Sequence, residues 1–301
     1  MAKLHHDEVD IDEALVRRLL AEQQPELIID ELIEVEPAGT DNRNFRLTSG
    51  HDQHLVRLPR KEDAAPGIAK EARFGHLLAP LLPVDIPVPT QVGAPGHGYP
   101  FAWSLSPWLP GELPVPGEAS KGLAEDLAEF VRALRSVDTR ALRGDPMLTS
   151  YRVNSIESRF AATQEFLPRC TGWADVEALT RAWQLIKDTT PYDGPPALAH
   201  TDLQPGNVLV DDDGRLSAVI DFGGLALGDP TIDLLPAWHL LGPTTRPTFR
   251  QALAVDDATW QRGMAWAMTI GVVALGYYAG SDSPLVRRSQ YQLEQVLLDL
   301  S

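Results

Sequence analysis

One segment constrains this chain more than any other: residues 199–223, which read AHTDLQPGNVLVDDDGRLSAVIDFG. Asn207 follows Asp202 by five residues, and Asp221 comes after two short apolar runs that flank a polar turn at 211–214. Apolar runs on either side of such a turn predict a β-hairpin. We therefore expect the side chains of Asp202, Asn207 and Asp221 to meet at one end of this hairpin.

The chemistry that suits these three side chains is phosphoryl transfer. A carboxylate can accept the proton of an acceptor hydroxyl, and carboxylate and amide oxygens can hold the Mg²⁺ that neutralises a nucleoside triphosphate. We expect Asp202 to be the catalytic base, and Asn207 and Asp221 to be the metal ligands. The alternative is that all three are ordinary turn residues, since Asp and Asn are common in loops.

The order and spacing resemble the His-x-Asp-x-x-x-x-Asn loop and the Asp-Phe-Gly motif of kinases. They are more similar still to the aminoglycoside and macrolide phosphotransferases, which carry His-Gly-Asp-Leu-x-x-x-Asn and then Ile-Asp-Trp or Ile-Asp-Phe. Thr201 stands here in place of the Gly, and the resemblance continues through GDPTID at 228–233. Protein kinases have Arg at the position of Thr201 and an Ala-Pro-Glu motif, so the sequence disfavours a protein kinase and implies no phosphorylation switch.

Two neighbours of the motif are interpreted as supports. We expect His200 to be a packed residue that fixes the backbone. We expect Asp233 either to accept hydrogen bonds from the backbone of the catalytic loop or to cap the helix that begins there.

The resemblance implies an α+β fold with two lobes, a small N-terminal antiparallel-sheet lobe (1–109) and a larger, mainly helical C-terminal lobe (110–301). Residue patterns agree with this organisation, and clustered prolines at 107–116 mark the boundary. Helical spacing occurs at 10–23, 68–78, 121–137, 156–166 and 176–186, and strand patterns at 27–35, 44–47, 54–58 and 99–105.

The N-terminal half supplies candidates for binding a nucleotide. The turn at Thr40, Asp41 and Asn42 lies where a kinase-like fold places its phosphate loop, and its amides could bind phosphate oxygens. Arg57 occupies the position of the expected strand lysine, as in macrolide kinases, and a guanidinium can bind phosphate through two hydrogen bonds. Glu71 is the candidate partner that holds Arg57, with Lys70 and Glu62 as alternatives.

The base of the nucleotide is expected against backbone groups near the boundary. The resemblance places this contact at Pro107 and Leu109. Backbone contacts do not distinguish ATP from GTP, so either is a candidate phosphate donor.

A formal charge of -16 and a pI near 4.8 argue against nucleic-acid or anionic-lipid partners, which need clustered Lys and Arg. A cationic small molecule fits better, although acidity can also serve solubility alone.

Cys170 is the only cysteine, which excludes an internal disulfide. The N-terminal residues lack a signal peptide, and the apolar stretch at 264–279 is too short to cross a membrane. We expect a cytoplasmic protein.

The expected function is transfer of the nucleotide γ-phosphate to a hydroxyl of an aminoglycoside- or macrolide-type antibiotic. One alternative is a metabolite kinase of the same fold, of the choline, homoserine or sugar type. A second is an inactive kinase-like protein that binds nucleotide without turnover, which the intact set of Asp202, Asn207 and Asp221 disfavours. The sequence also offers candidates for contacts with the acceptor, namely Asp256, Asp257, Asp282, Trp238, Trp266, Tyr277 and Tyr278. For the aromatic residues among them, packing in the core is the favoured alternative.

Overall fold

The computed structural model describes residues 8–35, 41–281 and 283–301. The chain divides into two compact units. The first comprises Met1–Pro80, Asp85–Pro110 and Ile220–Gly223, and the second comprises Leu81–Val84, Gly111–Val219 and Gly224–Ser301. Relative to a division between residues 109 and 110, the first unit also takes in Pro110 and Ile220–Gly223, and the second takes in Leu81–Val84.

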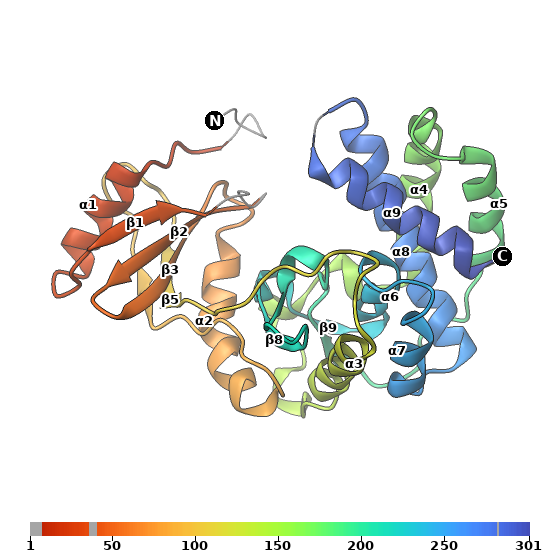
Figure 1. The fold of residues 1–301 in the computed structure, drawn as a ribbon, viewed down its shortest axis with the longest axis horizontal. Coiled ribbons are helices and arrows are strands. Elements are labelled where there is room, and N and C mark those ends of the chain that lie inside the picture. The colour runs from red at the N-terminus through yellow and green to blue at the C-terminus, as the bar shows by residue number, and fades with distance from the viewer. Residues whose placement is uncertain (1–7, 36–40, 282) are drawn as a thin grey trace. The chain divides into compact units, whose positions relative to one another are not determined.

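The first unit is built on an antiparallel five-stranded sheet with the order β1-β2-β3-β5-β4 (Figure 1). Helix α1 precedes the sheet, and α2 follows its third strand. The bounds are α1 Glu13–Gln23, β1 Glu31–Glu34, β2 Asn42–Ser49, β3 Asp52–Pro59, α2 Pro66–Leu78, β4 Gln91–Gly93 and β5 Trp103–Pro107. The predicted fold class, α+β with an N-terminal antiparallel sheet, is confirmed.

Alternation along the strands sorts the residues of the sheet between its two faces. On one face, Phe45, Val56 and Leu105 pack against the apolar side of α1, which buries Leu15 and Leu19. Arg57 lies between Val56 and Leu58 in the sequence, so its side chain is on the opposite face. This alternation brings the one charged candidate of β3 out of the apolar core and toward α2.

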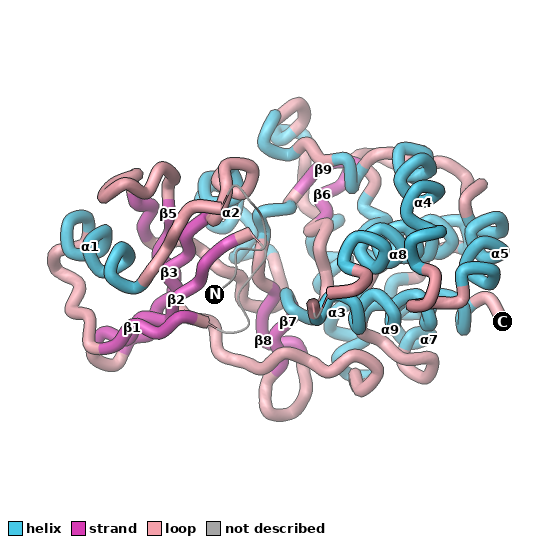
Figure 2. Tube along the Cα trace, turned by 90° about the horizontal axis from the view of Figure 1, so that it is seen from above, coloured by secondary structure: helices cyan, strands magenta, loops and turns pink. Residues whose placement is uncertain are grey.

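The second unit is mainly helical and contains two short sheets, which Figure 2 shows apart from each other. The pairs are β6 with β9 and β7 with β8. The bounds are α3 Lys121–Arg135, α4 Phe160–Phe166, α5 Val176–Ile186, β6 Ala197–Ala199, β7 Val208–Val210, β8 Leu216–Val219, β9 Ala226–Gly228, α6 Pro236–His239, α7 Arg246–Leu253, α8 Asp257–Tyr278 and α9 Pro284–Asp299.

The predicted hairpin is confirmed as β7 and β8. Its turn is held by Asp211, whose Oδ1 accepts hydrogen bonds from the backbone N–H groups of Asp213 and Arg215 at 3.0 and 2.9 Å. Arg215 in turn pairs with Asp126 of α3. The hairpin is therefore fixed to a long helix as well as closed by its own turn.

Helix α8 contains the long apolar stretch and is buried on most of its surface, as expected of a helix that is apolar all round. It begins earlier than the apolar stretch because Asp256 caps it through the N–H of Thr259 at 2.7 Å.

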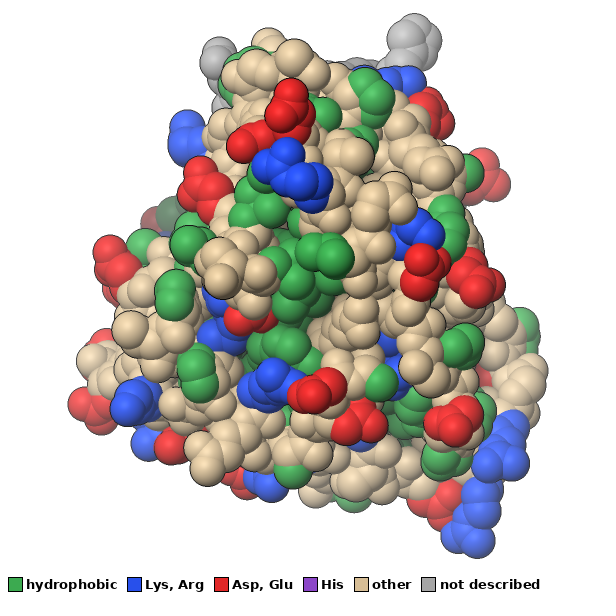
Figure 3. Space-filling model, turned by 90° about the vertical axis from the view of Figure 1, so that its right-hand side faces the viewer, with side chains coloured by type: hydrophobic (Ala, Val, Ile, Leu, Met, Phe, Trp, Pro, Cys, Tyr) green, Lys and Arg blue, Asp and Glu red, His purple; other side chains and the backbone are tan. Residues whose placement is uncertain are grey.

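Within the described residues, every helix is too short or too polar to span a bilayer. The face of the molecule in Figure 3 carries charges of both signs around a hydrophobic hollow, without a basic stripe.

Some predicted element boundaries were wrong. The strand expected at 27–35 begins only at Glu31, and the one expected at 99–105 begins at Trp103. Pro100, which has no N–H to donate, cannot join a ladder, and Tyr99 instead pairs with Gly96 in a separate turn. The helix expected at 156–166 is a 3₁₀ turn followed by α4.

Candidate active site

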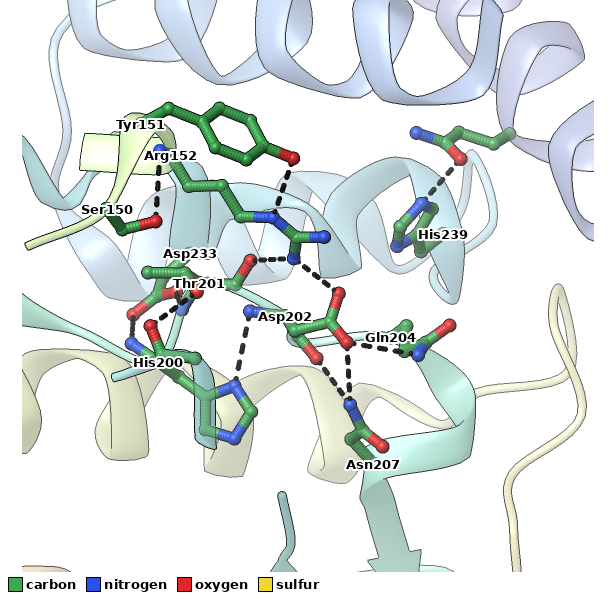
Figure 4. Close-up of polar contacts among 12 residues, drawn as sticks. Ser150, Tyr151, Arg152, His200, Thr201, Asp202, Gln204, Asn207, Asp233 and His239 are labelled. Carbon is green, nitrogen blue, oxygen red and sulfur yellow. Dashed lines mark hydrogen bonds and ion pairs between the residues drawn. The ribbon is translucent and has the colours of Figure 1, made fainter. Parts of the chain in front are cut away.

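Asp202 and Asn207 lie in the loop that connects β6 to β7 (Figure 4). The Nδ2 group of Asn207 donates hydrogen bonds to the backbone oxygen of Asp202 at 2.9 Å and to its Oδ2 at 3.1 Å. Gln204 Nε2 donates to the same Oδ2 at 3.2 Å. The Asp202 side chain is about one-third exposed, which leaves it open to an incoming molecule. The amide oxygen of Asn207 takes no part in these bonds.

Asp233 fixes the start of this loop. It is fully buried, and its two carboxylate oxygens accept hydrogen bonds from the backbone N–H groups of His200 and Thr201, both at 2.8 Å. His200 is fully buried as well, and its Nδ1 accepts the N–H of Asp202 at 3.3 Å. Both expected supporting roles are confirmed. Burial raises the pKa of Asp233, while His200 and the two N–H donors act to lower it.

Thr201 holds a left-handed backbone conformation, with φ of 72°. This conformation is strained for a β-branched residue and easy for glycine, the residue that similar kinases carry at this position. Besides the bond to Asp233, the Oγ1 of Thr201 donates to the backbone oxygen of Gly224 at 2.9 Å. The two bonds hold the strained residue that immediately precedes Asp202.

Arg152 was not identified from the sequence. Its Nη1 lies 2.7 Å from Asp202 Oδ1 and donates to the Thr201 oxygen at 2.8 Å. Burial lowers the pKa of Arg152, but the charges and hydrogen bonds of Asp202 and Tyr151 together raise it above its ordinary value, so the guanidinium stays charged. Figure 4 shows the side chain reaching over the catalytic loop from the turn at 150–152. An arginine in a polar turn fifty residues earlier carries no sequence signal for this role.

The first unit gathers a second set of charged groups around Arg57. Its Nη1 lies 2.5 Å from Glu71 Oε1, and its Nη2 lies 2.6 Å from Asp221 Oδ1. The Asn42 amide, with its oxygen turned toward Arg57, accepts from Nε at 3.0 Å and from Nη2 at 2.8 Å. The predicted pairing of Arg57 with Glu71 is therefore confirmed.

One cation here faces two carboxylates, for a formal net charge of -1. Burial lowers the pKa of Arg57, but Asp221 and Glu71 together raise it. Burial and the charge of Asp221 together raise the pKa of Glu71 above its ordinary value, although Arg57 acts to lower it. Asp221 also has a left-handed φ of 67°, and strained residues of this kind cluster at functional sites.

The remaining predicted nucleotide contacts are placed as follows. Thr40 lies outside the described residues. The carboxylate of Asp41 is 3.2 Å from Lys61 Nζ. Pro107 ends β5, and Leu109 follows it beyond Trp108, whose N–H donates to the Gln53 oxygen at 2.9 Å. Nucleotide contacts at these residues stay predictions.

Oxygen ligands suit Mg²⁺, and the two expected ligands offer one amide oxygen and one carboxylate. Asn207 fits because both of its side-chain hydrogen bonds use the amide nitrogen and leave the oxygen to a metal. Asp221 fits because it adds the second negative charge beside Arg57. No cluster of three or more His, Cys, Asp or Glu side chains in the described part of the chain could hold a metal.

Residues 33–266 match the sequence profile of a family described as the phosphotransferase enzyme family. The chain belongs to this family. Among curated protein sequences, no relative matches the chain.

Solved structures of phosphotransferases share the fold. The GDP and kanamycin complex of APH(2")-IIIa is 20% identical, with a TM-score of 0.75, and the match covers 95% of this chain and 99% of that one. Macrolide 2'-phosphotransferase MphH from Brachybacterium faecium is 23% identical, with a TM-score of 0.65 and coverage of 94% and 98%. The streptomycin–ATP–APH(2")-IIa complex is 18% identical, with a TM-score of 0.59 and coverage of 88% and 91%.

The acceptor candidates taken from the sequence fall on varied structural positions in this phosphotransferase. Trp238 and Trp266 are buried in the core. Asp256 caps α8, and Asp257 pairs with Arg250. Tyr277 is exposed and stacks edge-on against Tyr278, while Asp282 lies outside the described residues.

Proposed function

We propose that this protein transfers the γ-phosphoryl group of ATP or GTP to an alcohol hydroxyl of a small molecule. The observation that carries the proposal is the pairing of Asp202 with Asn207 on a loop held by Asp233. One exposed carboxylate is kept beside one amide whose oxygen is available, which is what a base and a metal ligand require.

The reaction balances with few groups. The acceptor hydroxyl oxygen forms a bond to the γ-phosphorus, and the bond from that phosphorus to the β–γ bridging oxygen breaks. The hydroxyl proton passes to Asp202, and the nucleoside diphosphate leaves with the electron pair of the broken bond. The products are a phosphate monoester and a nucleoside diphosphate.

The other residues bind and orient the nucleotide. Arg57 has the charge and the planar geometry to bind the α- and β-phosphates, and Glu71 holds it in place. Thr40, Asp41 and Asn42 would bind phosphate oxygens, and Pro107 and Leu109 would offer backbone groups to the base. When bound through Asn207 and Asp221, Mg²⁺ would neutralise the charge of the phosphates.

For the acceptor, aminoglycoside and macrolide antibiotics come first, because structures of this fold include phosphotransferases for both. The acidic net charge also favours a cationic acceptor at long range. We place the enzyme in the cytoplasm, where the buried thiol of Cys170 stays reduced. A metabolite kinase is the second candidate, and one observation favours it: two arginines line a cavity next to the catalytic loop.

The test is Mg²⁺-dependent nucleotide consumption with a panel of aminoglycosides, macrolides and hydroxylated metabolites. Asp202→Asn should lower kcat by at least about 10³-fold, because it removes the base, while nucleotide binding stays within about twofold. Unchanged turnover in this variant would refute the assigned role of Asp202. Nucleotide binding without turnover in the unmodified protein would instead indicate an inactive kinase-like protein.

A further inference from the structure

A cavity of about 350 Å³ lies within the second unit, against the catalytic loop. Pro205 of that loop forms part of its wall, and α9 and the segment at 113–116 form the rest. Pro205 is three positions after Asp202, and an extended chain spans at most about 11 Å over three residue steps. A small molecule in the cavity would therefore lie within one molecular length of the proposed base.

The lining of this cavity is apolar except for its basic groups. Leu113, Pro114, Pro116, Pro205, Pro284 and Tyr291 supply the wall, and Arg287 and Arg288 supply the charge. No acidic side chain occurs among these lining residues. The hydroxyl of Tyr291 already donates to the Leu241 oxygen at 3.2 Å, so the polar groups offered to a ligand are the guanidinium groups.

Arg288 is the arginine nearer to the catalytic loop. A Cβ placed on Gly206 would lie 3.5 Å from Arg288 Nη1, which brings the guanidinium next to the backbone between Asp202 and Asn207. In the described part of the chain, no ion pair involves Arg287 or Arg288. Two cations without a carboxylate partner would gain from an anionic ligand, because guanidinium pairs with carboxylate through parallel hydrogen bonds.

For a ligand inside the cavity, the charge of Arg287 and Arg288 outweighs the net charge of the whole chain. The formal charge of -16 acts over the whole surface, but salt screens it beyond about 8–10 Å. Two guanidinium groups in the wall of the cavity act at contact distance. A polycationic acceptor therefore meets repulsion at the place where it would dock, and an acid-bearing acceptor meets attraction.

We propose that the cavity binds the acceptor, and that the acceptor is a hydroxylated molecule with an apolar body and an anionic group, which Arg287 and Arg288 recognise. The role of the cavity as an acceptor site rests on the proposed phosphoryl transfer. The proposal changes the expected acceptor from an amine-bearing antibiotic to an organic acid.

Binding of a defined probe tests the cavity without turnover. We choose 4-hydroxyphenylacetate, which has a carboxylate, an apolar ring and a hydroxyl, and its methyl ester as the uncharged match. Calorimetry on the full chain should show at least about tenfold tighter binding of the acid than of the ester. Arg288→Gln and Arg287→Gln should each weaken binding of the acid at least fivefold and leave the ester unchanged. Arg181→Gln, at an exposed position of α5, serves as the matched control and should change neither.

Equal binding of acid and ester, or arginine variants that bind the acid normally, would overturn the proposal. Turnover then separates it from the proposed reaction. If hydroxy acids drive nucleotide consumption and this consumption falls in the arginine variants, the result supports both the phosphoryl transfer and the acid-bearing acceptor. Efficient phosphorylation of kanamycin or streptomycin that the arginine variants do not affect overturns the acid-bearing acceptor but leaves the proposed reaction standing. Absence of turnover in the unmodified protein overturns the proposed reaction alone, and unchanged turnover in Asp202→Asn overturns only the role of Asp202, since binding of the acid requires neither.

Discussion

Arg152 lies across the proposed base, with its Nη1 2.7 Å from Asp202 Oδ1. The other carboxylate oxygen of Asp202, Oδ2, accepts hydrogen bonds from the side-chain amides of Asn207 and Gln204. The carboxylate is thus held from two sides by residues that approach from different elements. This arrangement makes Arg152 a positioning residue for the reaction.

Replacing Arg152 should affect the chemical step more than binding. We expect Arg152→Met to lower kcat by about 10–100-fold, which is about 1.4–2.7 kcal/mol, because Asp202 loses one of its two restraints. The KM for nucleotide should change little. Arg152→Lys should recover part of the loss, since it restores the charge without the planar fork. Steady-state kinetics of both variants check this, and a raised KM at unchanged kcat would contradict a positioning role.

The charges around Arg57 predict unequal effects on stability. Arg57→Met leaves Glu71, which is 2% exposed, without its cation, so unfolding free energy should fall by about 3–5 kcal/mol. Glu71→Gln should cost less, about 1–2 kcal/mol, because Asp221 still pairs with Arg57. Urea denaturation measures both. If the two variants lose equal stability, Asp221 does not compensate.

Position 224 has no room for a side chain, because Thr201, the strained residue that precedes Asp202, packs against it. A Cβ on Gly224 would lie 2.7 Å from Thr201 Oγ1, and Thr201 cannot move away without breaking its bond to the Gly224 oxygen. We expect Gly224→Ala to cost about 1–3 kcal/mol and to reduce turnover.

Gly67→Ala, in α2, is the matched control for Gly224→Ala. A Cβ there meets nothing nearer than 3.5 Å, so it should be neutral or stabilising by up to about 1 kcal/mol. Thermal denaturation in parallel compares the two. Equal stability of both alanine variants would show that the loop adapts.

The buried His239 should make the free energy of unfolding depend on pH. Burial lowers its pKa from 6.5 to about 4, with Arg152 acting in the same direction against Gln292 and Asp202. The unfolded chain therefore binds a proton at higher pH than the folded protein does. The stability from neutral His239 is fully present above pH 6.5 and is lost as the pH falls toward 4, by up to about 3 kcal/mol.

His239→Gln should flatten this part of the curve of unfolding free energy against pH. Denaturation at half-unit steps from pH 7.5 to 4 tests the expectation. An unchanged slope between pH 6.5 and 4 would assign the dependence to other groups.

The sequence allowed prediction of the features that have a local pattern. The hairpin and most helices follow from periodicity and turn residues, whereas the pairing of Arg57 with Glu71 was expected from the resemblance to kinases. The sheet of β6 and β9 was missed, because strands of three residues, Ala197–Ala199 and Ala226–Gly228, are too short to show alternation. Strand β4 was missed for the same reason.

The partners of the candidate site were harder to predict than its motif. Arg152 reaches Asp202 only through tertiary folding, so no spacing rule connects them. The strain at Thr201 was also hidden: the sequence shows a Thr where similar kinases have Gly, but not that the backbone keeps the left-handed conformation. Backbone conformation at one residue depends on bonds to Asp233 and Gly224 that the sequence alone does not reveal.

The first unit is not one continuous stretch of chain, because it includes Ile220–Gly223 as well as residues before 111. During synthesis on the ribosome, Arg57 and Glu71 therefore emerge before Asp221, so the charged group around Arg57 is incomplete until residue 221 has been added. A fragment that ends at residue 110 would lack that partner permanently. Folding of the nucleotide-binding part is thus tied to completion of the catalytic segment, which makes the enzyme unsuited to division into independently working halves.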